Sequence, residues 1–378
     1  VLTALEKLED LLPKEGNSPS PVAFFAPAHG PMVRYGLVEL THLYKQWSQT
    51  QQNQSLTVAL LYASAYGNTA TLAQAIARGL TKAGVRVESI NCEATEPDAI
   101  KAAVEQAAGF IIGSPTLGGH APTQIQTALG IVLSNVPKDR LTGVFGSFGW
   151  SGEAIDLLEN KLKDAGYSFG FEPIRVKFKP TDQTLKFCEE AGTDFAQSLK
   201  KAQKRRQPRA LNADPVSSLS TVTATEEAVG RIVGSLAIVT TQREAVSSAM
   251  LASWISQATF TPPGFTVAVA KERAIESLLF PGCSFVLNIL PDGNYIPLMR
   301  HFLKPFGPGA DRFEGIETDT AENGAPILKG ASAYLECTVA SRMECGDHWV
   351  VYATVQQGQV LDATAKTAVH QRKSGTHY

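Results

Sequence analysis

Hydrophobic and polar positions follow two different patterns along this chain and divide it into two main parts. Between residues 56 and 200, apolar runs of strand length alternate with segments in which apolar residues recur every three or four positions, as on one face of a helix. The predicted strands are 56–62, 85–91, 109–113, 142–147 and 171–178, and the predicted helices are 69–80, 97–107, 122–134, 153–164 and 182–200. Strands that alternate with helices predict a parallel, doubly wound α/β sheet covered on both faces.

From residue 225 onward, short β-rich runs separated by turns dominate the pattern. The predicted strands are 235–241, 265–270, 284–289, 333–343 and 348–360, with helical stretches at 274–279 and 297–302. Several strands at short spacing favour a closed or partly closed antiparallel barrel. A basic run that begins at Lys200 leads into a polar stretch, which we interpret as a solvated helix end and an interdomain linker.

The first 54 residues are too short to bury a satisfactory core of their own. They predict an N-terminal helix, a loop rich in Pro and Ser at 16–21, a short strand at 22–26, a helix at 38–47 and a polar linker at 49–54. Because the chain starts at Val1 inside a helical pattern, we interpret this region as the remnant of a larger domain. The predicted organisation is a remnant at 1–54, an α/β domain at 55–203, a linker at 204–224 and a β domain at 225–378.

Composition narrows the possible functions. The chain has 378 residues, 44% of them hydrophobic and 19% charged, which is typical of a globular protein. A net charge of −2 gives no electrostatic reason to expect a nucleic-acid or membrane-surface partner. No apolar run approaches the roughly 20 residues that span a bilayer. The five scattered cysteines contain no CxxC pair, which predicts reduced thiols in the cytoplasm rather than disulfides or a zinc site.

The loop after the first predicted strand has the features of a phosphate site. It is small and polar, contains a glycine and leads directly into a helix, whose free N–H groups and dipole attract anions. The loop has no Lys or Arg, and neither a P-loop triplet nor a G-x-G-x-x-G turn is present. An uncharged cradle suits the single phosphate of a mononucleotide such as FMN, whereas the alternative is an ordinary βα turn. The candidate binding residues are Ser64, Ala65, Tyr66, Gly67, Asn68 and Thr69.

Two more loops, 114–121 and 147–152, follow the third and fourth predicted strands. Ligands of such sheets bind where the strands end, so we expect the three loops to share one site. Glycines allow the backbone to approach a flat ring, backbone amides can bond its polar edge, and aromatic side chains can pack against it. The candidate residues are Ser114, Pro115, Thr116, Leu117, Gly118, Gly119, Ser147, Phe148, Gly149, Trp150 and Gly152.

In their order and sequence, the three loops resemble the phosphate loop and the two ring-binding loops of flavodoxins, and more closely those of flavodiiron proteins. In flavodiiron proteins this domain follows a metallo-β-lactamase-like domain with a non-haem diiron site. The turn at 27–31, Pro-Ala-His-Gly-Pro, resembles the last turn of that domain, and His29 matches an iron ligand. Since this sequence lacks the cluster that would supply the remaining ligands, we expect His29 to be an orphan and expect no metal.

The β domain resembles the flavin reductase family, which binds FMN in a split barrel. The resemblance rests on 248–263 (SAMLASWISQATFTPP), 285–290 (FVLNIL) and the Gly-Asp-His turn at 346–348. It implies that residues 252–255 line a flavin, 247–249 approach its phosphate, Asn288 bonds a polar edge, and His348 lies near the nicotinamide. For each residue the alternative is barrel packing or a turn. The candidate binding residues are Ser247, Ser248, Ala249, Ala252, Ser253, Trp254, Ile255 and Asn288, with His348 as the catalytic residue in an orienting role.

The order of a flavodoxin-like domain and a flavin reductase domain resembles flavodiiron proteins of oxygenic phototrophs, cyanobacterial members above all. This resemblance implies an NAD(P)H:flavin oxidoreductase with one or two FMN sites, with NADPH favoured as donor, and oxygen as the final acceptor in the parent protein. It also implies an oligomeric parent, and a monomer or dimer for this chain. Two alternatives stay open: an electron carrier whose barrel only docks, and a regulatory FMN-binding module.

Overall fold

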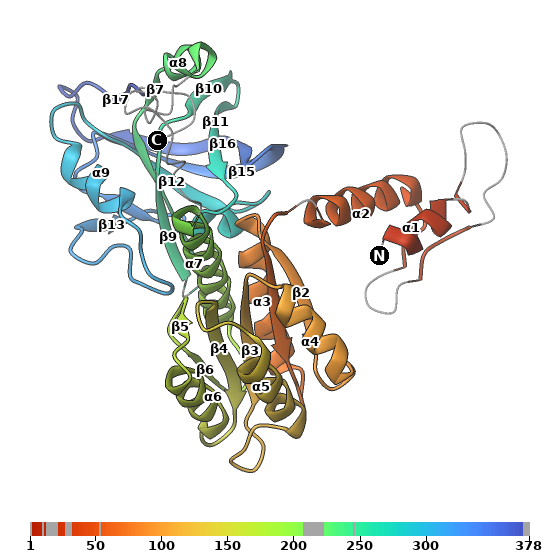
Figure 1. Cartoon of the computed structure of the whole chain (residues 1–378). Coiled ribbons are helices and arrows are strands. Elements are labelled where there is room, and N and C mark those ends of the chain that lie inside the picture. The colour runs from red at the N-terminus through yellow and green to blue at the C-terminus, as the bar shows by residue number, and fades with distance from the viewer. Residues whose placement is uncertain are drawn as a thin grey trace.

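The computed structural model describes residues 2–9, 11–12, 22–26, 32–52, 54–206, 223–244 and 246–372 (Figure 1). These residues form a small N-terminal helical region, a parallel α/β domain and an antiparallel β domain. No helix within the described ranges is both long and apolar enough to cross a membrane.

In the N-terminal region, helix α1 (Leu2–Glu9) packs against helix α2 (Leu37–Gln52), and the pair extends to one side of the other domains (Figure 1). Two predictions are wrong here. The predicted strand at 22–26 is only an isolated bridge between Phe25 and Val33. The predicted linker at 49–54 is mostly the end of α2, because its glutamines are good helix formers. The turn at 27–31, with His29, lies outside the described residues.

The α/β domain contains the predicted parallel sheet, in the order β2-β1-β3-β4-β5. Its strands are β1 (Thr57–Tyr62), β2 (Arg86–Asn91), β3 (Gly109–Pro115), β4 (Leu141–Phe148) and β5 (Ser168–Phe169). A further strand, β6 (Ile174–Lys177), also pairs with β4, so the predicted strand at 171–178 is wrong in its extent. Pro173, which has no N–H for a ladder, lies in the interruption between β5 and β6.

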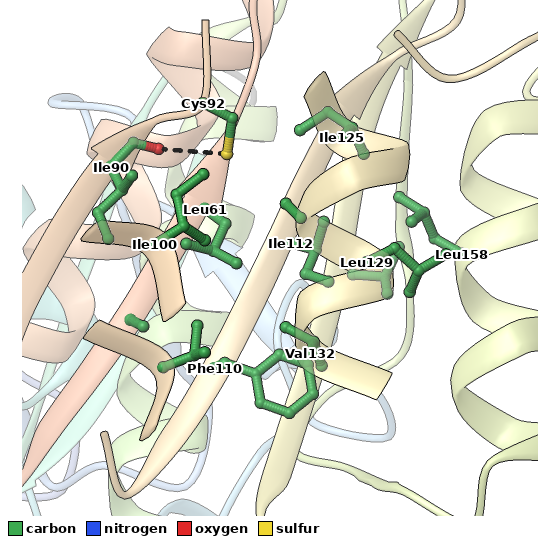
Figure 2. Close-up of a cluster of buried hydrophobic side chains, with 14 of the residues drawn as sticks. Leu61, Ile90, Cys92, Ile100, Phe110, Ile112, Ile125, Leu129, Val132 and Leu158 are labelled. Atoms are coloured by element: carbon green, nitrogen blue, oxygen red, sulfur yellow. Dashed lines mark hydrogen bonds between the residues drawn. The ribbon is translucent and has the colours of Figure 1, made fainter. Parts of the chain in front are cut away.

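Helices cover both faces of this sheet. Apolar side chains of α3 (Asn68–Lys82) and α7 (Asp182–Arg206) form the core on one face. Side chains of α4 (Pro97–Gln106), α5 (Thr123–Asn135) and α6 (Glu153–Asp164) form the core on the other face, part of which is shown in Figure 2. Alternate residues of β1 enter the two cores, which explains why residues 58–61 are all apolar.

The β domain is a seven-stranded antiparallel sheet in the order β10-β11-β16-β15-β12-β8-β9. Its strands are β8 (Ala237–Arg243), β9 (Val246–Ala252), β10 (Ile255–Phe260), β11 (Pro263–Ala270), β12 (Ser284–Ile289), β15 (Ala333–Cys345) and β16 (His348–Val360). Strands β9 and β10 form opposite edges of the sheet, yet only Ser253 and Trp254 separate them along the chain. The sheet must therefore roll until its edges meet, which confirms the predicted mainly-β, barrel-like domain.

Smaller elements complete the described part of the β domain. They are α8 (Ala224–Gly230), η1 (Ala274–Leu278), α9 (Ile296–Leu303), β7 (Gly234–Ser235), β13 (Thr318–Thr320), β14 (Pro326–Leu328) and β17 (Val369–His370). One apolar core fills the inside of the rolled sheet, and a second lies between its outer face and α9.

Candidate functional site

The three predicted loops of the α/β domain meet at one edge of the sheet. The hydroxyl oxygens of Thr69 and Ser147 lie 2.8 Å apart and share a buried hydrogen bond between the first and third loops. The Thr116 N–H donates to the Ser147 carbonyl at 3.0 Å, which joins the second loop to the third. The structure therefore brings together the loops that follow β1, β3 and β4.

The first loop is shaped for a small anion. Gly67, the residue before α3, has a φ of 80°, a left-handed conformation that favours glycine. The Ser64 hydroxyl accepts from the Ala70 N–H at 3.1 Å and ties the loop to the first turn of the helix. The first N–H groups of a helix have no partner within the helix, and those of this turn follow the exposed residues 65–67, where they suit an anion such as a phosphate.

Aromatic side chains surround the same edge of the sheet. Trp150 is 92% exposed and Tyr66 is 88% exposed, which is unusual for large apolar side chains and typical of a ligand site. The sequence analysis missed Phe178, whose ring centroid lies 6.3 Å from that of Trp150. Phe178 has a φ of 59°, a strained backbone often found at functional sites. Its position at the end of the last predicted strand was the signal that could have identified it.

The chemistry of these loops fits FMN. The Thr116 hydroxyl oxygen is buried and has no hydrogen-bond partner within the described part of the chain, which is costly unless a ligand supplies one. At Gly67, Gly118 and Gly119 an added Cβ would meet no atom of the described residues within 4 Å, so a ligand can approach the backbone at these positions. The hydroxyls of Ser114 and Ser147 form hydrogen bonds within the chain. Ser114 donates to the Pro115 carbonyl, and Ser147 bonds Thr69, so both hold the loops in place.

A second candidate site lies where the edges of the rolled sheet meet. The rings of Trp254 and His348 stack at 4.9 Å between centroids, with 38° between their planes. His348 Nδ1 lies 2.8 Å from Asp347 Oδ1, and this hydrogen bond holds the pKa of Asp347 below its usual value. The sequence analysis missed Arg372, whose guanidinium lies 4.7 Å from the centre of the Trp254 ring. The structure thus joins an aromatic ring, an oriented imidazole and a cation.

Strand geometry divides the other predicted residues of this site. Side chains alternate along β9, so Ser248 and Ala252 share one face with the barrel core, while Ser247 and Ala249 share the opposite face. The predicted phosphate contact at 247–249 therefore cannot use all three side chains. The Ser248 hydroxyl is buried and has no hydrogen-bond partner among the described residues, so Ser248 stays a candidate.

Asn288 does not face a ligand, and its predicted role is wrong. Its side chain is fully buried, and its amide donates to the Ile238 carbonyl and to the Thr240 hydroxyl. Its carbonyl oxygen accepts from the Leu328 N–H at 2.8 Å. Because these bonds use both ends of the amide, Asn288 joins β8, β12 and β14 within the domain.

The two candidate sites lie toward opposite ends of α7. The flavodoxin-type loops lie beside the start of this helix, and β9 runs along it. Ser247 and Gln183 border one cavity between the domains, and Met250 and Gln197 border another. From Gln183 to Gln197 the helix rises by about 21 Å. Trp254 comes after the end of β9 and lies beyond Met250 in the same direction. The two candidate sites are therefore separate from each other.

Among the residues that the structure describes, no group of three or more His, Cys, Asp or Glu could hold a metal ion. All five cysteines are free thiols in the structure.

Comparison with known proteins gives consistent matches. The family model for flavodoxin matches residues 60–192, and the model for the flavin reductase like domain matches residues 229–376. The chain is 63% identical to "Putative diflavin flavoprotein A 6" of Nostoc sp. PCC 7120, over all of this chain and 63% of that protein. It is 65% identical to "Putative diflavin flavoprotein A 3" of Synechocystis sp. PCC 6803, over all of this chain and 61% of that protein. The chain thus spans less than two thirds of the length of these curated relatives.

Among solved structures, the chain is similar to one described as "Metal soaked Flv1 flavodiiron core from Synechocystis sp. PCC6803". The sequence identity is 68%, the match covers 53% of this chain and 47% of that one, and the TM-score is 0.48.

Proposed function

We propose that this chain, a member of the flavodiiron (diflavin flavoprotein A) family with its flavodoxin and flavin reductase domains, passes electrons from a reduced nicotinamide to flavin. In this proposal it is the electron-transfer part of an oxidoreductase whose final acceptor is oxygen. The observation that carries the proposal is the buried, unpartnered Thr116 hydroxyl among three loops that converge beside exposed aromatic rings.

In the α/β domain, the residues bind and enclose the cofactor. The first turn of α3 and the Ser64–Thr69 loop would hold the phosphate, and Thr116 would bond a polar edge of the ring. Trp150 and Tyr66 would cover the ring faces and exclude water. When bound, FMN would supply the chemistry, because it accepts a hydride and releases electrons singly.

In the β domain, the residues position the donor. Asp347 fixes the His348 imidazole, and Trp254 supports it from one face. This pair would orient the nicotinamide against a second flavin, and orientation provides much of the rate of such a transfer. NADPH as the preferred donor rests on the resemblance to the family alone.

The separation of the sites adds one requirement. Since more than about 20 Å of α7 lies between them, electrons can pass between the sites only if the domains move or a second chain completes the path. Oxygen reduction at a diiron site, a monomeric or dimeric state and a cytoplasmic location are also part of this proposal.

An anaerobic titration tests the function. Flavin per chain is counted first, and NADPH or NADH is then added while the visible flavin absorption is followed. We expect bleaching by at least one nucleotide, slowed about tenfold or more in His348→Gln. His301→Gln is the matched control, because this histidine lies on α9 and bonds the Arg312 carbonyl. Flavin that is bleached by dithionite but by neither nucleotide would support the carrier alternative, and a chain that binds no flavin would refute both.

A further inference from the structure

Glu93 places a carboxylate on the candidate phosphate loop. Its Oε2 accepts the Ser64 N–H at 3.0 Å. Ser64 is the first polar residue of the loop, and its N–H is one of the donors that an anion there would use. The sequence analysis did not identify Glu93, because it belongs to the turn after β2, 29 residues away from Ser64 along the chain.

The position of Glu93 is set by the neighbouring strand. Strands β1 and β2 are paired in parallel, with Tyr62 opposite Asn91 at their ends, so the two following turns lie side by side. The Asn91 side chain accepts the Glu93 N–H at 3.0 Å, and the Cys92 N–H donates to the Tyr62 carbonyl at 2.8 Å. The backbone of the turn is therefore fixed, whereas the Glu93 side chain is exposed and can turn away from the loop once its bond to the Ser64 N–H breaks.

One N–H cannot donate a full hydrogen bond to a carboxylate and to a phosphate at the same time, and the two anions repel each other. We propose that Glu93 is an internal competitor for the phosphate loop, which weakens binding of phosphorylated flavin and leaves binding of the unphosphorylated flavin unaffected. FMN binding then requires the Glu93 side chain to turn outward. This inference rests on the proposed function only in assuming that these loops bind a flavin.

The test compares FMN with riboflavin, which has the same ring and no phosphate. Flavin-depleted full chains of wild type, Glu93→Gln and Glu88→Gln are titrated with each ligand. Binding at this site is followed by quenching of Trp150 fluorescence, isolated by subtracting the signal of the corresponding Trp150→Phe chain. Gln keeps an acceptor for the Ser64 N–H but removes the charge. Glu88 is the control, because it is also exposed on β2 but pairs with Ala59, away from the loop.

We expect Glu93→Gln to bind FMN about tenfold more tightly and riboflavin with unchanged affinity. The gain should shrink at high salt, which screens the repulsion between exposed charges. Glu88→Gln should match wild type with both ligands. An unchanged ratio of FMN to riboflavin affinity in Glu93→Gln, or weaker FMN binding, would overturn the competitor role while leaving the flavin site intact. Wild-type chains that bind neither ligand would instead refute the proposed flavin site.

Discussion

Helices α3 and α7 pack against each other with two glycines, Gly79 and Gly192, at their interface. A Cβ added to Gly79 would lie 1.9 Å from the Glu189 carbonyl oxygen and 2.8 Å from the Thr193 nitrogen, both of which are backbone atoms. A Cβ on Gly192 would lie 2.2 Å from the Ile76 carbonyl oxygen. Since neither backbone can rotate away as a side chain can, Gly79→Ala must push the helices apart.

The net effect of Gly79→Ala follows from two opposing contributions. Overpacking in a tight core costs about 3 kcal/mol at the upper end of its usual range. Alanine is the better helix former and returns about 1 kcal/mol. We therefore expect Gly79→Ala to destabilise the α/β domain by about 2 kcal/mol, which lowers its Tm by about 4–8 °C.

Gly130→Ala is the matched control for this prediction. Gly130 lies on α5 with an exposed backbone, and an added Cβ would meet no atom within 4 Å. The same substitution there should stabilise the chain by up to about 1 kcal/mol. Urea unfolding and thermal melts of the two variants should move in opposite directions. A Gly79→Ala chain that is as stable as wild type would refute the close approach of the two helices. It would also refute the rigid placement of the phosphate loop at the start of α3.

The remaining predictions concern the site, pH and thiol chemistry. Trp150→Ala should weaken FMN binding about tenfold with little change in Tm, because the ring is exposed; an equal loss of stability would contradict a ligand role. Burial raises the pKa of Asp194 to about 6, so the folded chain holds this proton more tightly than the unfolded chain. Stability should thus fall as pH rises from about 4 to 6, and Asp194→Asn should gain about 1 kcal/mol at neutral pH after solvent screening. Urea unfolding of wild type and variant at both ends of this range checks the sign. Burial raises the pKa of Cys92 to about 11 and those of Cys188 and Cys337 to about 12. Iodoacetamide at pH 8 should therefore alkylate the exposed Cys345 first, as peptide mass spectrometry would show.

The α/β domain was predictable because its signals are local. The central strands β1, β3 and β4 are largely apolar because they are buried on both faces, and the helices that cover them contribute one apolar face each. The ends of parallel strands must meet at one edge, so the order of the three loops along the chain was enough to place them in one site. The hydroxyls that link these loops were recognised as polar loop residues, but the sequence did not show which of them bond each other.

The features that the sequence did not predict depend on pairing between segments far apart in the chain. Strand β9 was not predicted, because its serines and alanines become a strand only by pairing with β8 at the edge of the rolled sheet. Asn288 has the residue type of a ligand contact, yet residues of β8 and β14 use both ends of its amide. Glu93 and Phe178 also lie at the candidate site. Each belongs to a turn that the pattern of apolar and polar residues did not assign to that site.

The sequence by itself therefore determined the two folds, their order and the loops that carry the candidate flavin chemistry, since burial periodicity and turn residues act over a few positions. Only the tertiary structure decided which side chains face a ligand, which support the loops and how far apart the two sites lie. The physical reason is that these properties depend on strand pairing and helix contacts between residues far apart in the sequence.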